Sequence, residues 1–261
     1  MKLIELIDKA KDPLWKGNAG YKIVTSHLNK ICDILDNPNI VKINTDMIDM
    51  LICALEEKSI SGSTINRYLS SLHTLLKYAV NRDLIEKMPV FSWKREREHR
   101  IRWVKEDEEL KLLNALTTLG NQEAVAAVQI LLDTGLRRGE LLNLKEDNID
   151  GDWVRIWQSK TGRQRSVPLT PRAKELLNKH VPFKIHPWDL WNYFRRARDM
   201  MGLTHDKQFV LHTLRHTTAT RLLRKTQNIA MVQKLLGHSK IETTLRYAHI
   251  DDQDLMEAVN S

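Results

Sequence analysis

The stretch LLGHSKIETTLRYAHI, residues 235–250, contains His238 and, nine positions later, Tyr247. Ser239 with a glutamate three residues on is typical of a capping box, so the pattern predicts a short helix over 240–248. A tyrosine on such a helix is either a core aromatic residue or a nucleophile. The segments that precede it decide between these two interpretations.

Upstream of this stretch, two segments alternate in strand fashion around the turn SKTG: GDWVRIWQ (151–158) and RQRSVPL (163–169). This pattern predicts a β-hairpin. Before it, a buried helix is expected to break at Gly135, and another to end near Leu144. The remaining apolar periodicity predicts helices over 171–180, 187–201, 211–225, 228–236 and 240–248.

The first ninety residues read as helices throughout. Residues 21–35 carry apolar side chains near a 3.6-residue period, Pro38 breaks the pattern, and a cap is expected at Asn44–Asp46. Ser63 is the expected cap of the next helix. The fold class is therefore mainly α with a small antiparallel β-sheet, in two domains.

A basic run without apolar periodicity, SWKREREHRIRW, follows the helical part at residues 92–103. It is either a solvated charged surface or a linker that lies on a phosphate backbone. We expect a helical domain over 1–93, a basic linker over 94–104, and a second domain with a C-terminal tail over 105–261. At about 150 residues per domain, 261 residues also favour two domains.

The charge points to a polyanionic partner. The formal net charge is +8, and it is uneven: residues 1–93 hold 12 Lys+Arg against 11 Asp+Glu, whereas the remainder holds 29 against 22. Lys and Arg contacts to phosphates supply most of the sequence-independent affinity for nucleic acid. The second part should therefore bind such a partner more strongly.

The two cysteines, Cys32 and Cys53, form no CxxC motif and are interpreted as structural thiols in a reducing compartment. The N-terminus has charges every few residues, which argues against a signal peptide. No apolar run approaches the ~20 residues of a membrane span. We therefore expect a cytoplasmic, nucleoid-associated protein.

Three local patterns carry candidate chemistry. His212 and Arg215 lie three residues apart and so share one helix face. Arg137 is followed by Glu140, which is either a local ion pair or a guanidinium held for a phosphate. Lys160 lies in the hairpin turn, where it is either a surface lysine or a proton donor delivered to a groove.

Together these segments, TGLRRGEL, SKTGRQRSVPL, HTLRH and LLGHSKIETTLRYAH, resemble the tyrosine recombinase (phage integrase) family. The resemblance covers residues 130–250, and a looser one covers the helices before residue 93. It implies that residues 1–93 form a DNA-binding domain and that residues 105–261 form the catalytic domain. It implies six catalytic residues: Arg137, Lys160, His212, Arg215, His238 and Tyr247. It also implies cleavage of DNA through a 3′-phosphotyrosine intermediate and strand exchange through a Holliday junction.

The residue types suit that chemistry. A phenol, with a pKa near ~10, is a better oxygen nucleophile and leaving group than a serine hydroxyl. Arg137 and Arg215 would neutralise charge in the transition state, with a hydrogen bond from His238. Lys160 would protonate the leaving oxygen, and His212 would accept the tyrosine proton or orient the phosphate.

Other residues receive supporting roles. Glu140 would hold Arg137, whereas His216 and His249 are interpreted as packing or capping histidines. Since cationic side chains replace a metal pair, we expect no metal site and no requirement for divalent metal or ATP. Basic side chains are expected to contact DNA at Arg67, Lys94, Arg95, Arg97, Arg100, Arg163 and Arg165.

The partners implied are double-stranded DNA with core recombination sites and three further copies of the chain on that DNA, with a monomer in solution. Accessory DNA-bending or directionality proteins are compatible with the resemblance. Integration or excision of a phage or mobile element is the first interpretation, and a Xer-like dimer-resolving recombinase is the alternative. A non-catalytic helix-turn-helix protein and a type IB topoisomerase-like enzyme are weaker alternatives.

Overall fold

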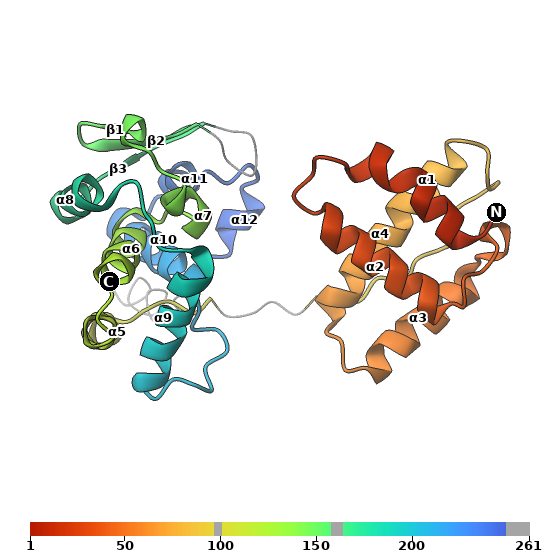
Figure 1. Cartoon of the computed structure of the whole chain (residues 1–261), viewed down its shortest axis with the longest axis horizontal. Coiled ribbons are helices and arrows are strands. Elements are labelled where there is room, and N and C mark those ends of the chain that lie inside the picture. The colour runs from red at the N-terminus through yellow and green to blue at the C-terminus, as the bar shows by residue number, and fades with distance from the viewer. Residues whose placement is uncertain (97–100, 158–163, 249–261) are drawn as a thin grey trace, which may run out of the picture. The chain divides into compact units, whose positions relative to one another are not determined.

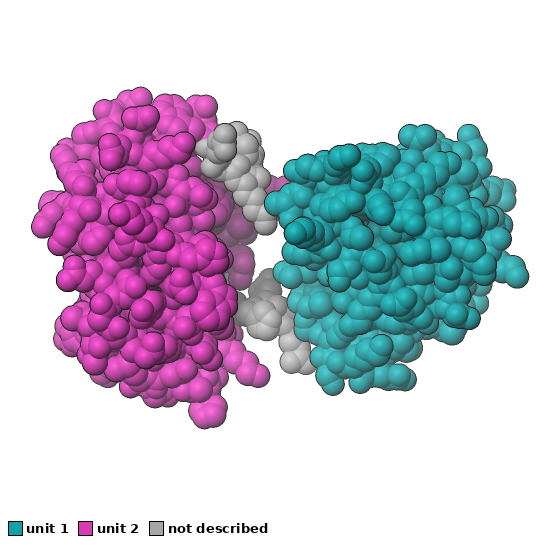
Figure 2. All heavy atoms as spheres, in the orientation of Figure 1, with its two compact units in different colours: residues 1–98 teal, residues 99–261 magenta. Residues whose placement is uncertain are grey.

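The computed structural model describes residues 1–96, 101–157 and 164–248. The chain divides into two compact units, Met1–Glu98 and His99–Ser261, coloured separately in Figure 2. Each unit has its own hydrophobic core. In the described parts of the chain, no helix is both long and apolar enough to span a membrane.

The N-terminal unit is a bundle of four α-helices and one short 3-10 helix (Figure 1). In chain order the elements are α1 (Leu3–Trp15), α2 (Tyr21–Ile34), η1 (Ile40–Lys42), α3 (Thr45–Glu57) and α4 (Gly62–Val80). α2 packs against α1, α3 and α4. The apolar stripes that the sequence predicts form one core in this unit.

Two helix starts in this unit show how well a cap can be read from sequence. Asn44 caps α3 as predicted, because its side chain accepts a hydrogen bond from the Met47 backbone N–H over 3.0 Å. The prediction that Ser63 caps α4 is wrong. The cap residue is Ser61, two positions earlier, and Ser63 is already inside the helix.

The C-terminal unit combines eight α-helices, one 3-10 helix and three strands within its described residues. In order they are α5 (Glu106–Thr118), α6 (Gln122–Thr134), α7 (Arg138–Leu142), η2 (Glu146–Asn148), β1 (Ile149–Asp150), β2 (Trp153–Ile156), β3 (Arg165–Pro168), α8 (Pro171–His180), α9 (Pro187–Met200), α10 (Leu211–Thr226), α11 (Ile229–Leu236) and α12 (Glu242–Leu245). The mainly helical fold class with a small antiparallel sheet is confirmed.

The sheet is antiparallel, in the order β1–β2–β3. β2 and β3 form the predicted hairpin, with Val154 opposite Val167 in the register. Both of these side chains are buried, whereas their neighbours along the strands face outward. β1, only two residues long, was not predicted; it pairs with β2 across a turn that contains Gly151.

Helix α6 is central to the packing of this unit, since α5, α8 and α10 all pack against it. α10 also packs against α11, so it connects α6 to the C-terminal helices (Figure 1). α6 ends at Gly135, which adopts the left-handed conformation with φ of 64°. This is the predicted break.

The last described helix differs from its prediction. α12 spans four residues rather than nine, and the expected capping box at Ser239 is wrong. Glu242 is the first residue of the helix, not the third, so its carboxylate cannot reach back in a capping box. Ile241 occupies the cap position in a helical conformation without a side-chain hydrogen bond.

Candidate active site

Arg215 lies on α10 and joins two helix ends. Its side chain is buried, with 2% exposed, and its guanidinium donates to the Gly135 carbonyl over 2.6 Å and to the Leu236 carbonyl. These carbonyls belong to the residues that end α6 and α11. In the described parts of the chain Arg215 has no ion pair with a carboxylate, so its charge is satisfied only by carbonyl dipoles.

Glu140, on α7, binds two arginines. Its carboxylate accepts from Arg137 Nη1 over 2.8 Å and from the Arg137 backbone N–H over 2.8 Å. Arg165 donates to both carboxylate oxygens, over 2.8 and 2.6 Å. Burial alone would raise the pKa of Glu140, but the hydrogen bonds from Arg165 and Arg137 lower it to about 2. The carboxylate is therefore anionic and fixes Arg137.

The placement of Arg165 corrects its predicted role as a DNA contact. Its side chain is only 7% exposed and is committed to Glu140, with a further hydrogen bond from Nε to the Leu235 carbonyl over 3.1 Å. The strand pattern was the available signal, because Arg165 and the buried Val167 alternate onto the same face of β3. Arg165 thus links the sheet, α7 and the end of α11.

His238 follows Gly237, the left-handed residue that ends α11. Its Nδ1 lies 2.9 Å from Thr244 Oγ1, so the α12 segment orients the ring. Burial, with the positive charges of Arg215 and Arg137, lowers the pKa of His238 to about 4. The ring is neutral at physiological pH and can donate one N–H.

Tyr247 is buried, with 3% of the residue exposed. Its hydroxyl lies 2.8 Å from Nδ1 of His216 on α10. The interpretation of His216 as a packing or capping histidine is therefore incomplete, since the ring contacts the candidate nucleophile. Its position four residues after His212 places it on the same helix face, but the sequence alone does not show that Tyr247 meets it.

The site concentrates positive charge. Burial, followed by the charges of Arg137 and Arg165, lowers the pKa of Arg215 to about 9. Burial and the charges of Arg215, Arg137 and Arg246 also lower the pKa of His212. Five of the six predicted catalytic residues therefore lie in one electrostatically coupled cluster: Arg137, His212, Arg215, His238 and Tyr247. Such a concentration of positive charge favours the binding of an anion.

The other predicted residues either fall outside the described residues or belong to the N-terminal unit. Lys160, the sixth predicted catalytic residue, falls outside the described residues, as do Arg97, Arg100, Arg163 and His249. Lys94 pairs with Glu56 over 2.8 Å and contacts Asn66 through its backbone. Arg95 and Arg67 are exposed in the N-terminal unit.

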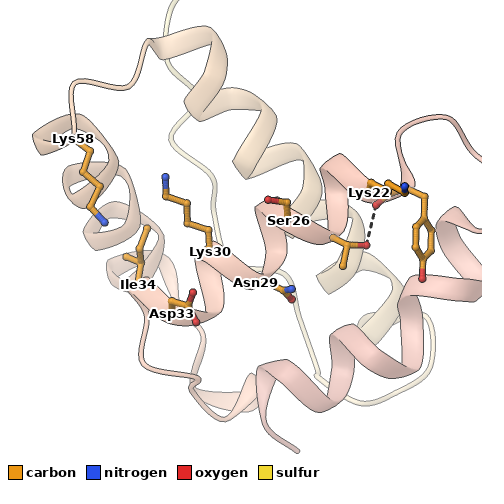
Figure 3. A pocket seen from close by; sticks show the side chains of 9 residues that line it. Lys22, Ser26, Asn29, Lys30, Asp33, Ile34 and Lys58 are labelled. Carbon is orange, nitrogen blue, oxygen red and sulfur yellow. Dashed lines mark hydrogen bonds between the residues drawn. The ribbon is translucent and has the colours of Figure 1, made fainter.

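A basic hollow lies on the surface of the N-terminal unit, along α2 (Figure 3). Lys22, Lys30 and Lys58 line it, together with Ser26 and other polar side chains. Arg67 of α4 and Lys30 both act on His27 of α2, where burial and these two charges lower the histidine pKa. Arg67 itself does not line the hollow.

Two family models match the chain. The phage integrase family model matches residues 102–254, and the model of the phage integrase N-terminal SAM-like domain matches residues 25–83. Together they cover parts of both compact units.

Individual proteins are similar as well. A tyrosine recombinase of Thermosipho africanus is 30% identical over 237 residues, which cover 81% of this chain and 82% of the relative. Tyrosine recombinase XerA of Saccharolobus solfataricus is 27% identical, over 92% of this chain and 85% of the relative. The Tn1549 transposon integrase, solved with circular intermediate DNA, shares the fold with a TM-score of 0.79 at 21% identity, over 100% of this chain and 99% of that one. The chain therefore belongs to the phage integrase family, the tyrosine-type site-specific DNA recombinases.

Proposed function

We propose that this chain cleaves double-stranded DNA at core recombination sites by attack of the Tyr247 hydroxyl on a phosphodiester, and rejoins it by the reverse reaction. The observation that carries the proposal is the position of Tyr247 beside the cationic cluster. Burial raises the pKa of its phenol, and the charges of Arg215 and Arg246 act in the opposite direction, which favours the phenolate. A phosphotyrosine link retains the energy of the phosphodiester bond. Rejoining would therefore need no ATP.

The arginines would bind the scissile phosphate. Arg215 is fixed by two carbonyls and Arg137 by Glu140, so both guanidiniums are oriented before DNA arrives. Donors that are already in place stabilise developing negative charge without reorganisation. His238, oriented by Thr244, would add a third donor. An incoming phosphate would also relieve the mutual repulsion of Arg137 and Arg215.

The remaining proton transfers involve Lys160 and the α10 histidines. We assign Lys160 as the general acid that protonates the leaving 5′-oxygen, because an ammonium on a flexible stem can follow that atom. His212 would orient the phosphate from the start of α10. With three cations around the phosphate, the reaction is proposed to need no divalent metal.

On DNA, four copies would synapse two sites and exchange strands through a Holliday junction, with the basic hollow along α2 as one contact to the duplex. We propose integration or excision of a phage or other mobile element, in keeping with the family of the match. A Xer-like resolving recombinase is a second candidate, favoured by the similarity to XerA. The sequences attached to the protein would separate them: element ends support the first, a single chromosomal site the second.

The test is to capture the covalent intermediate. The protein is expressed in bacteria that carry the candidate target DNA, cells are lysed in SDS with EDTA, and DNA attached to the protein is sequenced. We expect attached DNA with the wild type and with Tyr193→Phe, a matched control on α9, but not with Tyr247→Phe. Attachment that survives Tyr247→Phe would overturn the proposal.

Nicked substrates give a second test, since loss of the short cleaved fragment traps the intermediate. Wild-type protein that binds these substrates but never attaches to them would indicate a plain DNA-binding protein. Tyr247→Phe should bind the same DNA with unchanged affinity, because only one hydroxyl is removed.

A further inference from the structure

His216 is not among the six predicted catalytic residues, yet its ring is hydrogen-bonded to the hydroxyl of Tyr247. We infer that His216 takes the proton of the Tyr247 hydroxyl when that oxygen attacks the phosphate, and returns it when the DNA is rejoined. This inference rests on the proposed role of Tyr247 as nucleophile. It makes His216 a catalytic residue, since it contacts a reacting atom.

The geometry favours His216 over every other described group. Its Nδ1 lies 2.8 Å from the hydroxyl oxygen, within the range of a general base in contact with its proton. Among the described residues, no other side chain is hydrogen-bonded to that hydroxyl. Because Tyr247 is 3% exposed, bulk water has little access to take the proton instead.

His212 is the obvious competitor, because it begins the HTLRH segment. Its ring packs edge-on against His216, with 4.7 Å between centroids. Among the described residues, no hydrogen bond or ring contact joins His212 to Tyr247. The phenol and His216 rings are 5.7 Å apart between centroids. His212 therefore supports the position of His216, whereas His216 contacts the nucleophile.

Burial and the charges around His216 keep its ring neutral in the free protein. Burial, together with His212, Arg246, Arg215 and His238, lowers its pKa to about 3, so the free ring is neutral. In the neutral tautomer that carries its proton on Nε2, Nδ1 accepts the hydrogen bond from the phenol, and the inference uses this tautomer. A bound phosphodiester would offset Arg215 and Arg246, which favours the protonated ring at the moment of transfer.

The Tyr247 oxygen forms a bond to phosphorus as the bond from phosphorus to the 5′-oxygen breaks. The phenol proton moves to Nδ1 of His216, and the leaving 5′-oxygen takes a proton from another donor, for which Lys160 is proposed. In rejoining, the 5′-hydroxyl attacks phosphorus and gives its proton back to that donor. The bond from phosphorus to the Tyr247 oxygen breaks, and His216 returns its proton to the departing phenolate.

The test measures covalent attachment to a nicked substrate in single turnovers from pH 5.5 to 9.5, with wild type, His216→Asn and His216→Leu. Asparagine can still accept a hydrogen bond from the phenol but cannot take its proton, whereas leucine does neither. His205→Asn, an exposed histidine of the same unit, is the matched control. Circular dichroism and DNA binding verify that each variant is folded.

We expect His216→Asn to attach about 100-fold or more slowly at pH 7, in the range typical of a lost general base. Its rate should rise about tenfold per pH unit, because hydroxide must now remove the proton. The wild-type rate should lack this slope. A rate that falls by the same factor at every pH, or that does not change, would overturn the inference.

A more acidic phenol provides a second readout. Fluorinated tyrosine at position 247 should partly restore attachment by His216→Asn, since its proton leaves more easily, and should change the wild-type rate far less. Equal effects in both backgrounds would overturn the inference. Wild type that forms no adduct, or an adduct that survives Tyr247→Phe, would instead overturn the proposed function itself.

Discussion

Arg165 and Glu140 form a bidentate ion pair, in which the guanidinium donates to both carboxylate oxygens, over 2.8 and 2.6 Å. Each side chain is only 7% exposed. Glu140 also holds Arg137, so a strand residue fixes a proposed catalytic arginine through a shared carboxylate. The site is thus positioned by β3 as well as by the helices, and this yields direct tests.

The first prediction concerns the loss of that carboxylate. Glu140→Ala should lower the free energy of unfolding by about 3–5 kcal/mol, because it leaves Arg165 buried without its counter-charge. Urea unfolding would measure this. Asp150→Ala, which removes the partner of Arg155 in an exposed ion pair, is the control and should cost no more than ~1 kcal/mol. Equal losses in the two variants would contradict the buried pairing.

The second prediction concerns acid stability. The pKa of Glu140 is about 2 in the folded chain, against 4.5 for the free side chain. Because the folded value is the lower one, the contribution is fully present above pH ~4.5 and is lost as pH falls toward ~2. It amounts to about 3 kcal/mol over that window. Glu140→Gln should lack this component, and unfolding followed at several pH values would reveal a shallower acid decline. Parallel curves for the two proteins would count against the assignment.

Much of this architecture is readable from local pattern. The α8 range is as predicted. α6 ends at the left-handed Gly135, and α2 ends at Ile34, shortly before Pro38, because backbone preferences act over a few residues. The hairpin follows from alternation around a glycine-containing turn. The predicted range of α12 was too long, because the spacing of Ser239 and Glu242 matches that of a capping box although none forms.

The site was less readable where contacts span long separations. Arg137, Glu140 and Arg215 could be predicted as site residues from the sequence motifs. The role of Arg165 depends on Glu140, a partner 25 residues away. The His216 contact joins residues 31 positions apart. Periodicity reveals which face a side chain occupies, not which distant segment packs on that face.

The third prediction concerns the basic hollow on α2. Lys22→Ala and Lys58→Ala should each weaken DNA binding to a similar degree on all DNA sequences. Each should also reduce the slope of log K against log salt concentration by about 1, as expected for a lost phosphate contact. Lys11→Ala is the control, because this lysine of α1 is ion-paired with Asp8. Binding measured at several salt concentrations checks the slope. Slopes that match wild type would remove the hollow from the DNA interface.

The fourth prediction concerns Gly237, which lies directly before His238. Its φ is 64°, and a Cβ added there would lie 2.7 Å from Cδ of Arg165. Gly202 has a similar φ of 75° but no atom within 4 Å of an added Cβ. The two glycines therefore separate the cost of the backbone conformation from the cost of the clash.

Gly202→Ala should cost about 1–2 kcal/mol, the strain of a left-handed alanine. Gly237→Ala should cost that amount and a further 1–3 kcal/mol, since Arg165 is held by Glu140 and cannot move away freely. It should also slow covalent attachment to nicked DNA. A displaced Arg165 would move Glu140 and with it Arg137, and the altered backbone at position 237 would move His238. Gly202→Ala should attach at the wild-type rate. If the two variants were equally stable and equally active, Arg165 would yield to the new methyl group, and the rigid link from β3 to the catalytic residues would be refuted.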